Sequence, residues 1–290
     1  MKKILVTGIN GFFASRFADF YKSKYAVTGI SHQQLDITDA DQTLQIIQAN
    51  SPDYIVHAAA IADTMLCQNE PELSLAVNVN GAVNVARAAV ACGARFIYLS
   101  SDQIYVGTNA GAGPHREDEP VTPANVYGRH KLQAETEILS FMPEAIALRL
   151  TWLFGLPERN KKISSNLVWN LAKTMMSNQP AGFPVHDLRC VTYVYELIEN
   201  IEKMFNIPGG IYNAGSENDL NGYELAQTVF KAMGFENRIE ELLLKDEERF
   251  RDHPRDMRIS NQKLKACGIT FSNSADAIKK CVKDFSFGNI

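Results

Sequence analysis

The sequence is poor in cysteine, and its cysteines are not spaced as pairs. The five are Cys67, Cys92, Cys190, Cys267 and Cys281, and none belongs to a CxxC motif. An odd number without paired spacing argues against a disulfide framework and against a zinc ribbon. We therefore predict no metal site and expect a reducing, cytoplasmic compartment.

The chain also lacks a strong charge of either sign and a long apolar run. Its 29 Lys and Arg residues nearly balance its 33 Asp and Glu residues, which gives a net charge of −4. This balance provides no electrostatic reason to bind nucleic acid or an anionic membrane.

The first apolar run breaks at Gly8, and no stretch approaches the ~18 apolar residues of a membrane helix. We expect neither nucleic acid nor a membrane as partner.

What the sequence does contain is a regular alternation of apolar strands and helices. Strands are predicted at 2–8, 25–31, 53–60, 95–101 and 145–155. Helices are predicted between them, at 12–24, 39–52, 71–93 and 123–141. Nearly continuous apolar strands that alternate with helices indicate an α/β fold, with a Rossmann-type, doubly wound parallel sheet covered on both faces.

The alternation fades after Gly155, where a polar loop and later a charged, helical tail follow. We therefore predict two parts. Residues 1–155, together with about 186–212, would form an NAD(P)-binding Rossmann domain. Residues from about 156 to 185 and from 213 to 290 would form a smaller C-terminal α/β lobe that binds the substrate.

The first predicted strand runs into a turn with small residues. Gly8, Gly11 and Ala14 give the spacing GxxGxxA between a strand and a helix. Small residues let the backbone approach a diphosphate, and the helix N-terminus offers free N–H groups and a partial positive charge. In this context the turn predicts a dinucleotide site. A tight turn without a ligand is the alternative.

The end of the second predicted strand bears on the choice of cofactor. An NAD-specific protein often has an acidic residue there for the ribose 2′-hydroxyl, whereas this chain has Ser31 and His32. Neither side chain would repel a 2′-phosphate, and no arginine is present to clamp one. NADP is therefore preferred as the predicted cofactor and NAD is also compatible.

A serine, a tyrosine and a lysine could form a proton-transfer site. Tyr127 and Lys131 are four residues apart in a predicted helix and share one of its faces. A nearby ammonium favours the phenolate and would lower the tyrosine pKa, which suits acid–base work near neutral pH. Ser101 ends a predicted strand, at the sheet edge where α/β proteins bind ligands. Taken alone, the Tyr–Lys spacing could be a chance surface pair.

Several motifs, in this order, resemble those of extended short-chain dehydrogenases/reductases. They are the glycine turn, HAAA at 57–60, SS at 100–101, YGRHK at 127–131 and LRLTWLFG at 148–155. The chain is most similar to the dTDP-4-dehydrorhamnose reductase branch of sugar-nucleotide reductases. The resemblance is strong over residues 1–155 and thinner afterwards, where HPRDMRISNQKL at 253–264 is similar to a Pro-Arg tail motif.

The resemblance implies a role for each matching residue. Tyr127 would protonate a ketone oxygen, Ser101 would hydrogen-bond the same oxygen, and Lys131 would hold the nicotinamide ribose. The expected cofactor-binding residues, besides Tyr127 and Lys131, are Gly8, Asn10, Gly11, Phe12, Phe13, Ser31, His32, Asp36, Ile37, Ala58, Ala59, Ala60, Asn78 and Leu150. The expected substrate-binding residues are Asp102, Gln103, Trp152, Arg189 and Arg255.

Two segments depart from this branch. Where the branch has a charged Asp-Lys-Ala-Glu run, residues 65–68 read Met-Leu-Cys-Gln, so the rim of the pocket would be less charged. Asp63 could substitute in part or could cap a turn. The segment HDLRCVTYV, at 186–194, replaces the usual Asp-Gln-x-Gly-x-Pro-Thr run. Its Arg189 could bind a diphosphate or form a salt bridge at the domain boundary.

The sequence favours reduction over elimination of water. A dehydratase needs an acid and a base beside the substrate hydroxyl, but Asp102 is followed by Gln103, whose carboxamide cannot move a proton. We therefore expect an NAD(P)H-dependent reductase of a 4-keto-6-deoxy nucleotide sugar, most simply dTDP-4-dehydrorhamnose. An NAD-dependent nucleotide-sugar 4-epimerase and a non-catalytic NADP-binding regulatory subunit are the alternatives. Helices at 71–92 and 124–141 could form a homodimer interface or pack on their own sheet.

Overall fold

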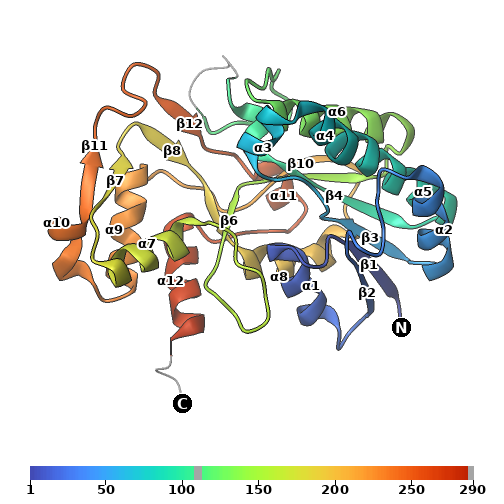
Figure 1. The fold of residues 1–290 in the computed structure, drawn as a ribbon, viewed down its shortest axis with the longest axis horizontal. Coiled ribbons are helices and arrows are strands. Elements are labelled where there is room, and N and C mark those ends of the chain that lie inside the picture. Colours follow the sequence, from blue (N-terminus) through green and yellow to red (C-terminus); the bar gives the residue numbers. More distant parts are fainter. Residues whose placement is uncertain (108–112, 287–290) are drawn as a thin grey trace. The chain divides into compact units, whose positions relative to one another are not determined.

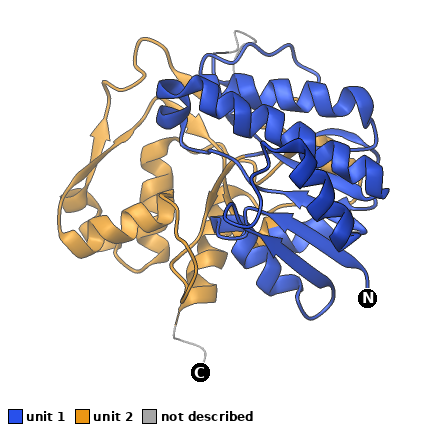
Figure 2. Cartoon of the chain, turned by 45° about the vertical axis from the view of Figure 1, so that its right-hand side comes forward, with its two compact units in different colours: residues 1–111, 117–150, 198–212 blue, residues 112–116, 151–197, 213–290 orange. Residues whose placement is uncertain are grey.

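The computed structural model describes residues 1–107 and 113–286, and it divides into two compact units (Figure 2). Unit 1 comprises residues 1–111, 117–150 and 198–212. Unit 2 comprises residues 112–116, 151–197 and 213–290. Each unit is thus assembled from segments that are far apart in the sequence.

Unit 1 is built on a sheet with the strand order β10-β5-β4-β3-β1-β2 (Figure 1). Parallel pairing joins β2 to β1, β1 to β3, β3 to β4 and β4 to β5. The order reverses between β1 and β3, and in such sheets ligands bind at the carboxyl ends beside this switch point. The strands are β1 (Lys3–Thr7), β2 (Ala26–Ile30), β3 (Tyr54–His57), β4 (Arg95–Ser101), β5 (Ile146–Leu150) and β10 (Gly210–Ala214).

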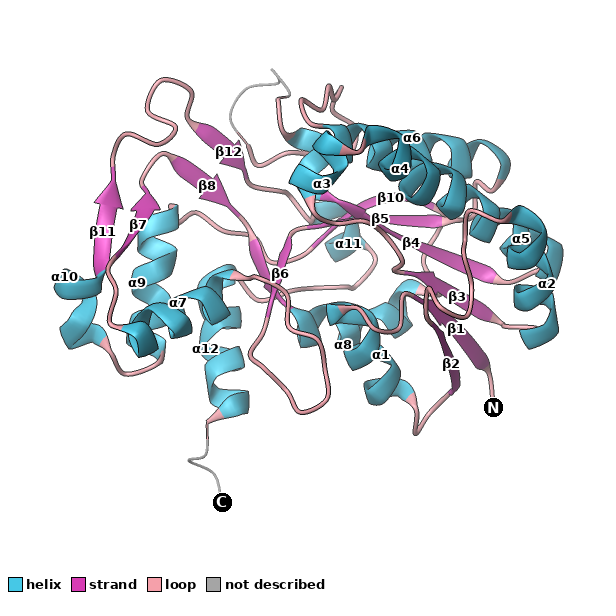
Figure 3. Ribbon diagram, in the orientation of Figure 1, coloured by secondary structure: helices cyan, strands magenta, loops and turns pink. Residues whose placement is uncertain are grey.

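Helices cover both faces of this sheet (Figure 3). On one face, α1 (Phe12–Tyr21) lies beside α8 (Val194–Met204), where the Tyr21 hydroxyl donates a hydrogen bond to the Ile198 carbonyl at 2.7 Å. On the other face, α2 (Ala40–Asn50) and α6 (Val126–Phe141) flank a long helix that spans Pro71–Cys92. The short helix α3 (Thr64–Asn69) precedes it.

One long helix runs from Pro71 to Cys92 through a π-helical turn. It consists of α4 (Pro71–Leu75), the π-helical turn Ala76–Gly81 and α5 (Ala82–Cys92), and it ends at Gly93 with a positive φ, as predicted. By length and composition this helix could cross a membrane, which the sequence reading had not anticipated. Half of the most apolar part of this helix is buried inside the protein.

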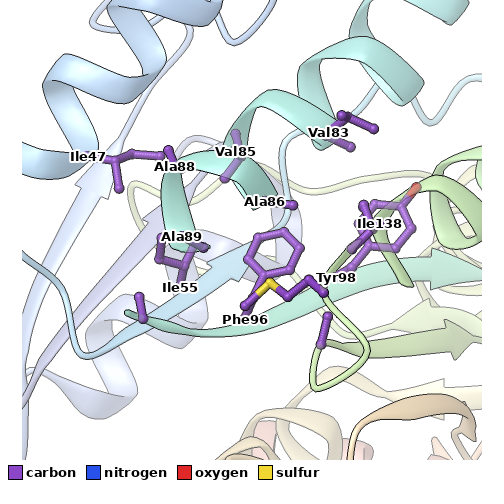
Figure 4. Close-up of a cluster of buried hydrophobic side chains, with 14 of the residues drawn as sticks. Ile47, Ile55, Val83, Val85, Ala86, Ala88, Ala89, Phe96, Tyr98 and Ile138 are labelled. Atoms are coloured by element: carbon purple, nitrogen blue, oxygen red, sulfur yellow. The ribbon is translucent and has the colours of Figure 1, made fainter. Parts of the chain in front are cut away.

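One hydrophobic core cluster of unit 1 lies between the sheet and the helices α2, α5 and α6 (Figure 4). Phe96 and Tyr98 on β4 point into it, where they meet the small alanine face of α5 and Ile138 on α6. Small residues on the helix and rings on the strand allow close packing of the helix on the sheet. This packing sets the distance between α6 and β4. Both elements carry predicted site residues.

A buried ion pair ties α6 to β5. The Arg149 guanidinium donates three hydrogen bonds to the Glu135 carboxylate, at 2.9 to 3.2 Å, and a fourth to the Tyr105 hydroxyl at 3.0 Å. Both charged side chains are at most 2% exposed. A buried pair with satisfied hydrogen bonds is costly to break, because the remaining charge has no partner.

Unit 2 contains short parallel strand pairs and helices. The pairs are β6 with β9, β7 with β11 and β8 with β12. The predicted strand 145–155 is therefore wrong as a single strand, because β5 ends at Leu150 and β6 begins at Trp152. The strands and helices of unit 2 are β6 (Trp152–Phe154), α7 (Leu167–Ser177), β7 (Ala181–Pro184), β8 (Asp187–Arg189), β9 (Val191–Tyr193), α9 (Gly222–Ala232), α10 (Ile239–Leu242), β11 (Leu243–Asp246), β12 (Arg255–Met257), α11 (Gln262–Ala266) and α12 (Ser274–Phe285).

Removing the Glu135 carboxylate should destabilise the fold strongly. We expect Glu135→Ala to lower the free energy of unfolding by about 3–5 kcal/mol, because Arg149 stays buried without its partner. Lys22→Ala is the matched control, since its pair with Asp19 is exposed and should contribute at most about 1 kcal/mol. Denaturant titration measures both. Similar losses in the two variants would contradict the assigned role of the buried pair.

Candidate functional site

The glycine turn lies at the carboxyl end of β1 and can hold a diphosphate. Gly8 has a φ of +71°, and a Cβ there would lie 2.9 Å from the Ala59 Cα. The N–H of Gly11 donates to the Gly8 carbonyl at 2.8 Å and closes the turn. Helix α1 starts at Phe12, and no side chain of the described residues caps its first N–H groups. These free donors fit an anion such as a diphosphate.

The two phenylalanines of this turn contribute their backbone, not their rings. Phe12 and Phe13 are buried, with the Phe12 ring against Arg16 and the Phe13 ring stacked on Phe17 at 5.5 Å. Asn10 is exposed at the tip of the turn. Sequence reasoning placed all three beside the cofactor, and this geometry leaves the two N–H groups and the Asn10 side chain for that role.

A hydroxyl bridge beneath the turn positions the alanine motif. The Thr7 hydroxyl oxygen accepts hydrogen bonds from the N–H groups of Ala58 and Ala59, both at 3.1 Å. It therefore donates its own proton to His57 Nδ1 at 2.8 Å, which places the imidazole proton on Nε2. Burial lowers the His57 pKa to about 3, so the ring is neutral. The half-buried residues 58–60 then form a wall of small side chains.

Ser101 begins a tight turn at the carboxyl end of β4. Its hydroxyl accepts from the Gln103 N–H at 3.2 Å and donates to the Asp102 carboxylate at 3.4 Å. Leu150 lies beside it in the register of β4 and β5. Both Ser101 and Leu150 are nearly buried, at 8% and 9% exposed. The serine hydroxyl is therefore held at the sheet edge by its own turn.

Gln103 joins this turn to the start of α6. Its side-chain oxygen accepts from Asn125, which caps α6 by accepting from the Gly128 N–H at 2.7 Å. A Cβ on Gly128 would lie 2.4 Å from the Gln103 carbonyl oxygen, so only glycine lets the two segments approach this closely. The carboxamide at position 103 thus has a structural task. This contact brings the Ser101 turn beside the helix that carries Tyr127.

Tyr127 is buried and protonated. It is 8% exposed, and burial raises its pKa above the ordinary value. The Ser101 side chain acts to lower the pKa, whereas the Asp102 carboxylate raises it further. The expectation that Lys131 would bring the phenol pKa down is therefore wrong in the net direction, because burial is the larger effect. A protonated phenol suits a proton donor.

Lys131 lies beneath Tyr127 with its ammonium group buried. The side chain is 2% exposed, and Nζ donates to the Leu99 carbonyl at 2.7 Å. Nζ also lies 4.5 Å from the centre of the Tyr98 ring and 5.8 Å from that of Tyr127. Burial lowers the Lys131 pKa to about 7, while the Glu135 carboxylate acts in the opposite direction. The ammonium is thus poised between charged and neutral forms near neutral pH.

Asn78 sits in the π-helical turn and holds the loop that follows the alanine motif. Its Oδ1 accepts from the Ile61 N–H at 2.9 Å, and its Nδ2 donates to the Ile61 carbonyl at 3.0 Å. Nδ2 also donates to the Ser74 hydroxyl, which bonds to His130 on α6 at 2.8 Å. Sequence reasoning missed Ser74 and His130. The π-helical turn, which is often found at functional sites, is not visible in the sequence pattern.

The region predicted to bind the adenosine end is a polar turn after β2. The N–H and hydroxyl of Ser31 both donate to the Gln34 side chain at 2.9 Å, and His32 is exposed. Asp36 accepts from the N–H and the hydroxyl of Thr38, which lower its pKa. Ile37 is buried against Gly81. The exposed imidazole of His32 is therefore accessible to a ligand at this turn, whereas the Asp36 carboxylate stabilises the turn itself through its hydrogen bonds with Thr38.

Within unit 2, two of the predicted substrate residues lie together. The Arg189 guanidinium stacks over the Trp152 ring at 4.5 Å. Arg255 instead forms a two-pronged ion pair with Asp187, with both contacts at 2.7 Å. Its guanidinium is therefore committed to a partner inside the unit.

Residues 63–68, which depart from the pattern of the reductase branch, form the N-cap and most of the short helix α3. Asp63 caps α3 by accepting from the N–H groups of Met65 and Leu66, and these two side chains are exposed. Cys67 is buried against Tyr127 and Val126. No group of three potential metal ligands occurs among the residues that the structure describes.

Comparisons with known proteins identify the family of the chain. The model of the family described as RmlD substrate binding domain matches residues 1–287. The chain belongs to this family. Among its relatives is the spore coat polysaccharide biosynthesis protein SpsK of Bacillus subtilis, 24% identical over 99% of both chains. Methionine adenosyltransferase 2 subunit beta of Bos taurus is 28% identical, over 80% of this chain and 72% of that protein.

Other relatives and similar structures are reductases and an epimerase. The dTDP-4-dehydrorhamnose reductase of Aggregatibacter actinomycetemcomitans is 26% identical over 79% of both chains. The dTDP-4-dehydrorhamnose reductase of Bacillus anthracis, solved with NADP, superimposes with a TM-score of 0.86 at 21% identity, over 99% of this chain and 100% of that one. UDP-glucose 4-epimerase of Thermus thermophilus, solved with NAD, gives a TM-score of 0.80 at 19% identity, over 99% and 100%.

Membership in the RmlD family confirms several predictions. The Rossmann-type α/β fold is confirmed, and so is the enzyme class, an NAD(P)-dependent oxidoreductase of the extended short-chain dehydrogenase type. Of the solved structures that share this fold, one holds NADP and another holds NAD. The site residues stay predictions that the geometry described above makes testable.

Replacing Gly8 should abolish tight cofactor binding. Gly8→Ala adds a Cβ against the Ala59 backbone at 2.9 Å and strains a positive φ, so the turn must open. We expect NADPH affinity to fall by about tenfold or more, as measured by fluorescence titration. Gly93→Ala is the matched control, because its φ is +65° but its Cβ would meet open space. Equal affinity in the two variants would argue against a diphosphate at this turn.

Proposed function

We propose that the protein is an NADPH-preferring reductase of a 4-keto-6-deoxy nucleotide sugar, most simply dTDP-4-dehydrorhamnose. The observation that carries this proposal is a buried, protonated Tyr127 whose pKa responds to Ser101 and Asp102, with Lys131 on the next turn of the same helix. The relatives that act on dTDP-4-dehydrorhamnose supply the substrate class. The substrate would be held by Arg189 and Trp152.

The chain's own residues account for each proton and charge in this reaction. The bound nicotinamide would supply the hydride to the ketone carbon. As charge grows on the ketone oxygen, the Ser101 hydroxyl would stabilise it and Tyr127 would transfer its proton. The Lys131 ammonium would stabilise the tyrosinate that results, since an opposite charge close by favours the ionised form. The Asp102 carboxylate opposes ionisation of Tyr127, which keeps the proton on the phenol until the ketone needs it.

Elimination of water is disfavoured by the contacts of Gln103. Its carboxamide is occupied by Asn125 and cannot act as an acid or a base. An epimerase would use the same Ser–Tyr–Lys set with a tightly held cofactor, and the Thermus epimerase shares the fold. A regulatory subunit is suggested by the methionine adenosyltransferase relatives, although all three residues of the proton-transfer set are present here.

We also propose that NADPH is preferred because of the turn after β2. Residues 31–34 present a serine, an exposed histidine and two glutamines, with no carboxylate that would repel a 2′-phosphate.

The free thiols of all five cysteines agree with the proposed cytoplasmic, reducing location. The long helix from Pro71 to Cys92 is half buried and would remain with the sheet.

Tyr127→Phe tests the reaction directly. With dTDP-4-dehydrorhamnose as substrate, we expect kcat for NADPH oxidation to fall by about 10²–10⁴-fold, because the proton donor is lost while the ring remains. NADPH affinity should change little.

Tyr25→Phe is the control for this experiment, because it removes a phenol that hydrogen-bonds Glu202 away from the site. Undiminished turnover in Tyr127→Phe would refute the role of Tyr127. Formation of a 4-epimer without net use of cofactor would favour the epimerase. No turnover of any nucleotide 4-keto sugar, with tight binding of a protein partner, would favour the regulatory subunit.

A further inference from the structure

The surroundings of Lys131 contain a residue that no motif singles out. The ammonium of Lys131 lies over the face of Tyr98, 4.5 Å from the ring centre, and donates to the Leu99 carbonyl at 2.7 Å. Lys131 and Tyr98 are 2% and 1% exposed, so water has little access to either side chain. The face of an aromatic ring attracts a cation, and the attraction grows when both are desolvated.

Other titratable groups also face Lys131. They are Tyr127 and Glu135 from α6, Cys67 from α3 and His57 from β3. Glu135 is the charged partner among them, but it accepts three hydrogen bonds from Arg149. Much of its negative charge is therefore neutralised locally. Besides the Leu99 carbonyl, the ring of Tyr98 is a group in direct contact that favours the charged lysine and has no other cation to satisfy.

Neighbouring side chains flank the Tyr98 ring on both sides. His57, its neighbour in the register of β3 and β4, stacks beside it with ring centres 6.0 Å apart and planes 17° from parallel. On the helix side, the ring packs near Ile138 (Figure 4). Among the described residues, the Tyr98 hydroxyl has no hydrogen-bond partner. The ring, and not the hydroxyl, is therefore what the surroundings use.

We propose that Tyr98 is a positioning residue whose ring holds the Lys131 ammonium, in its charged form, at the end of β4 and within reach of Tyr127. The contact between ring and ammonium does not depend on the identity of the substrate. Its consequence for catalysis rests on the proposed function, in which the charged lysine stabilises the Tyr127 phenolate.

The test varies the ring and follows Lys131 itself. The Lys131 side chain is titrated by NMR in protein labelled at lysine Nζ and Cε, with Lys131→Met to assign the signal. Tyr98→Phe keeps the ring and removes the unpartnered hydroxyl, so the titration should match that of the wild type. Tyr98→Leu removes the ring, and the Lys131 titration should move down by about one pH unit or more. NADPH binding is measured against pH on the same variants. In Tyr98→Leu it should be weaker than in the wild type at pH values between the titration midpoints of Lys131 in the two proteins.

Fluorinated phenylalanines at position 98 keep the test decisive if Tyr98→Leu does not fold. Successive fluorine atoms weaken the negative ring face with little change of shape, so the Lys131 titration should move down step by step. An unchanged titration along this series would overturn the proposal. Neither measurement uses a sugar, so a protein without reductase activity would contradict the proposed function but leave this inference open to its own result.

Discussion

The buried ammonium of Lys131 is the constraint on which the site depends. A charge that is 2% exposed is tolerated only where the fold supplies compensating groups, and here these are the Leu99 carbonyl and the Tyr98 ring. Placing them requires α6 to lie close on β4. Gly128 lets α6 approach the turn that follows β4, and the ion pair between Glu135 and Arg149 ties α6 to β5, the neighbour of β4 in the sheet.

The same edge of the sheet collects the other parts of the site, each held by a local interaction. Thr7 and His57 fix the alanine motif, Gly8 lets the diphosphate turn approach it, and the Ser101 turn stands on the next strand. None of these interactions is strong alone. Together they bring a protonated phenol and a serine hydroxyl to one edge of a parallel sheet, which is where such folds bind ligands.

The sequence predicted the framework well because apolar runs and small residues report directly on strands and close turns. The Gly93 helix end and the parallel strands were found in this way. It predicted the electrostatics less well, because spacing along a helix does not reveal burial. The pKa of Tyr127 rises where the Tyr–Lys spacing implied a fall. The roles of Gln103 and Arg255 as tethers depend on partners distant in sequence, Asn125 and Asp187, which no local pattern identifies.

The central claim is that the fold keeps a lysine charge buried at a cost to stability. Its most direct test is the free energy of unfolding of the wild type and of Lys131→Met against pH. The Lys131 pKa is about 7 in the folded protein, below its ordinary value of 10.5, so the unfolded chain binds the extra proton between these values. The wild type should therefore gain stability relative to Lys131→Met as the pH rises above about 7, by up to about 1.4 kcal/mol per pH unit. A difference between the two proteins that stays constant from about pH 6 to about pH 9 would contradict the account.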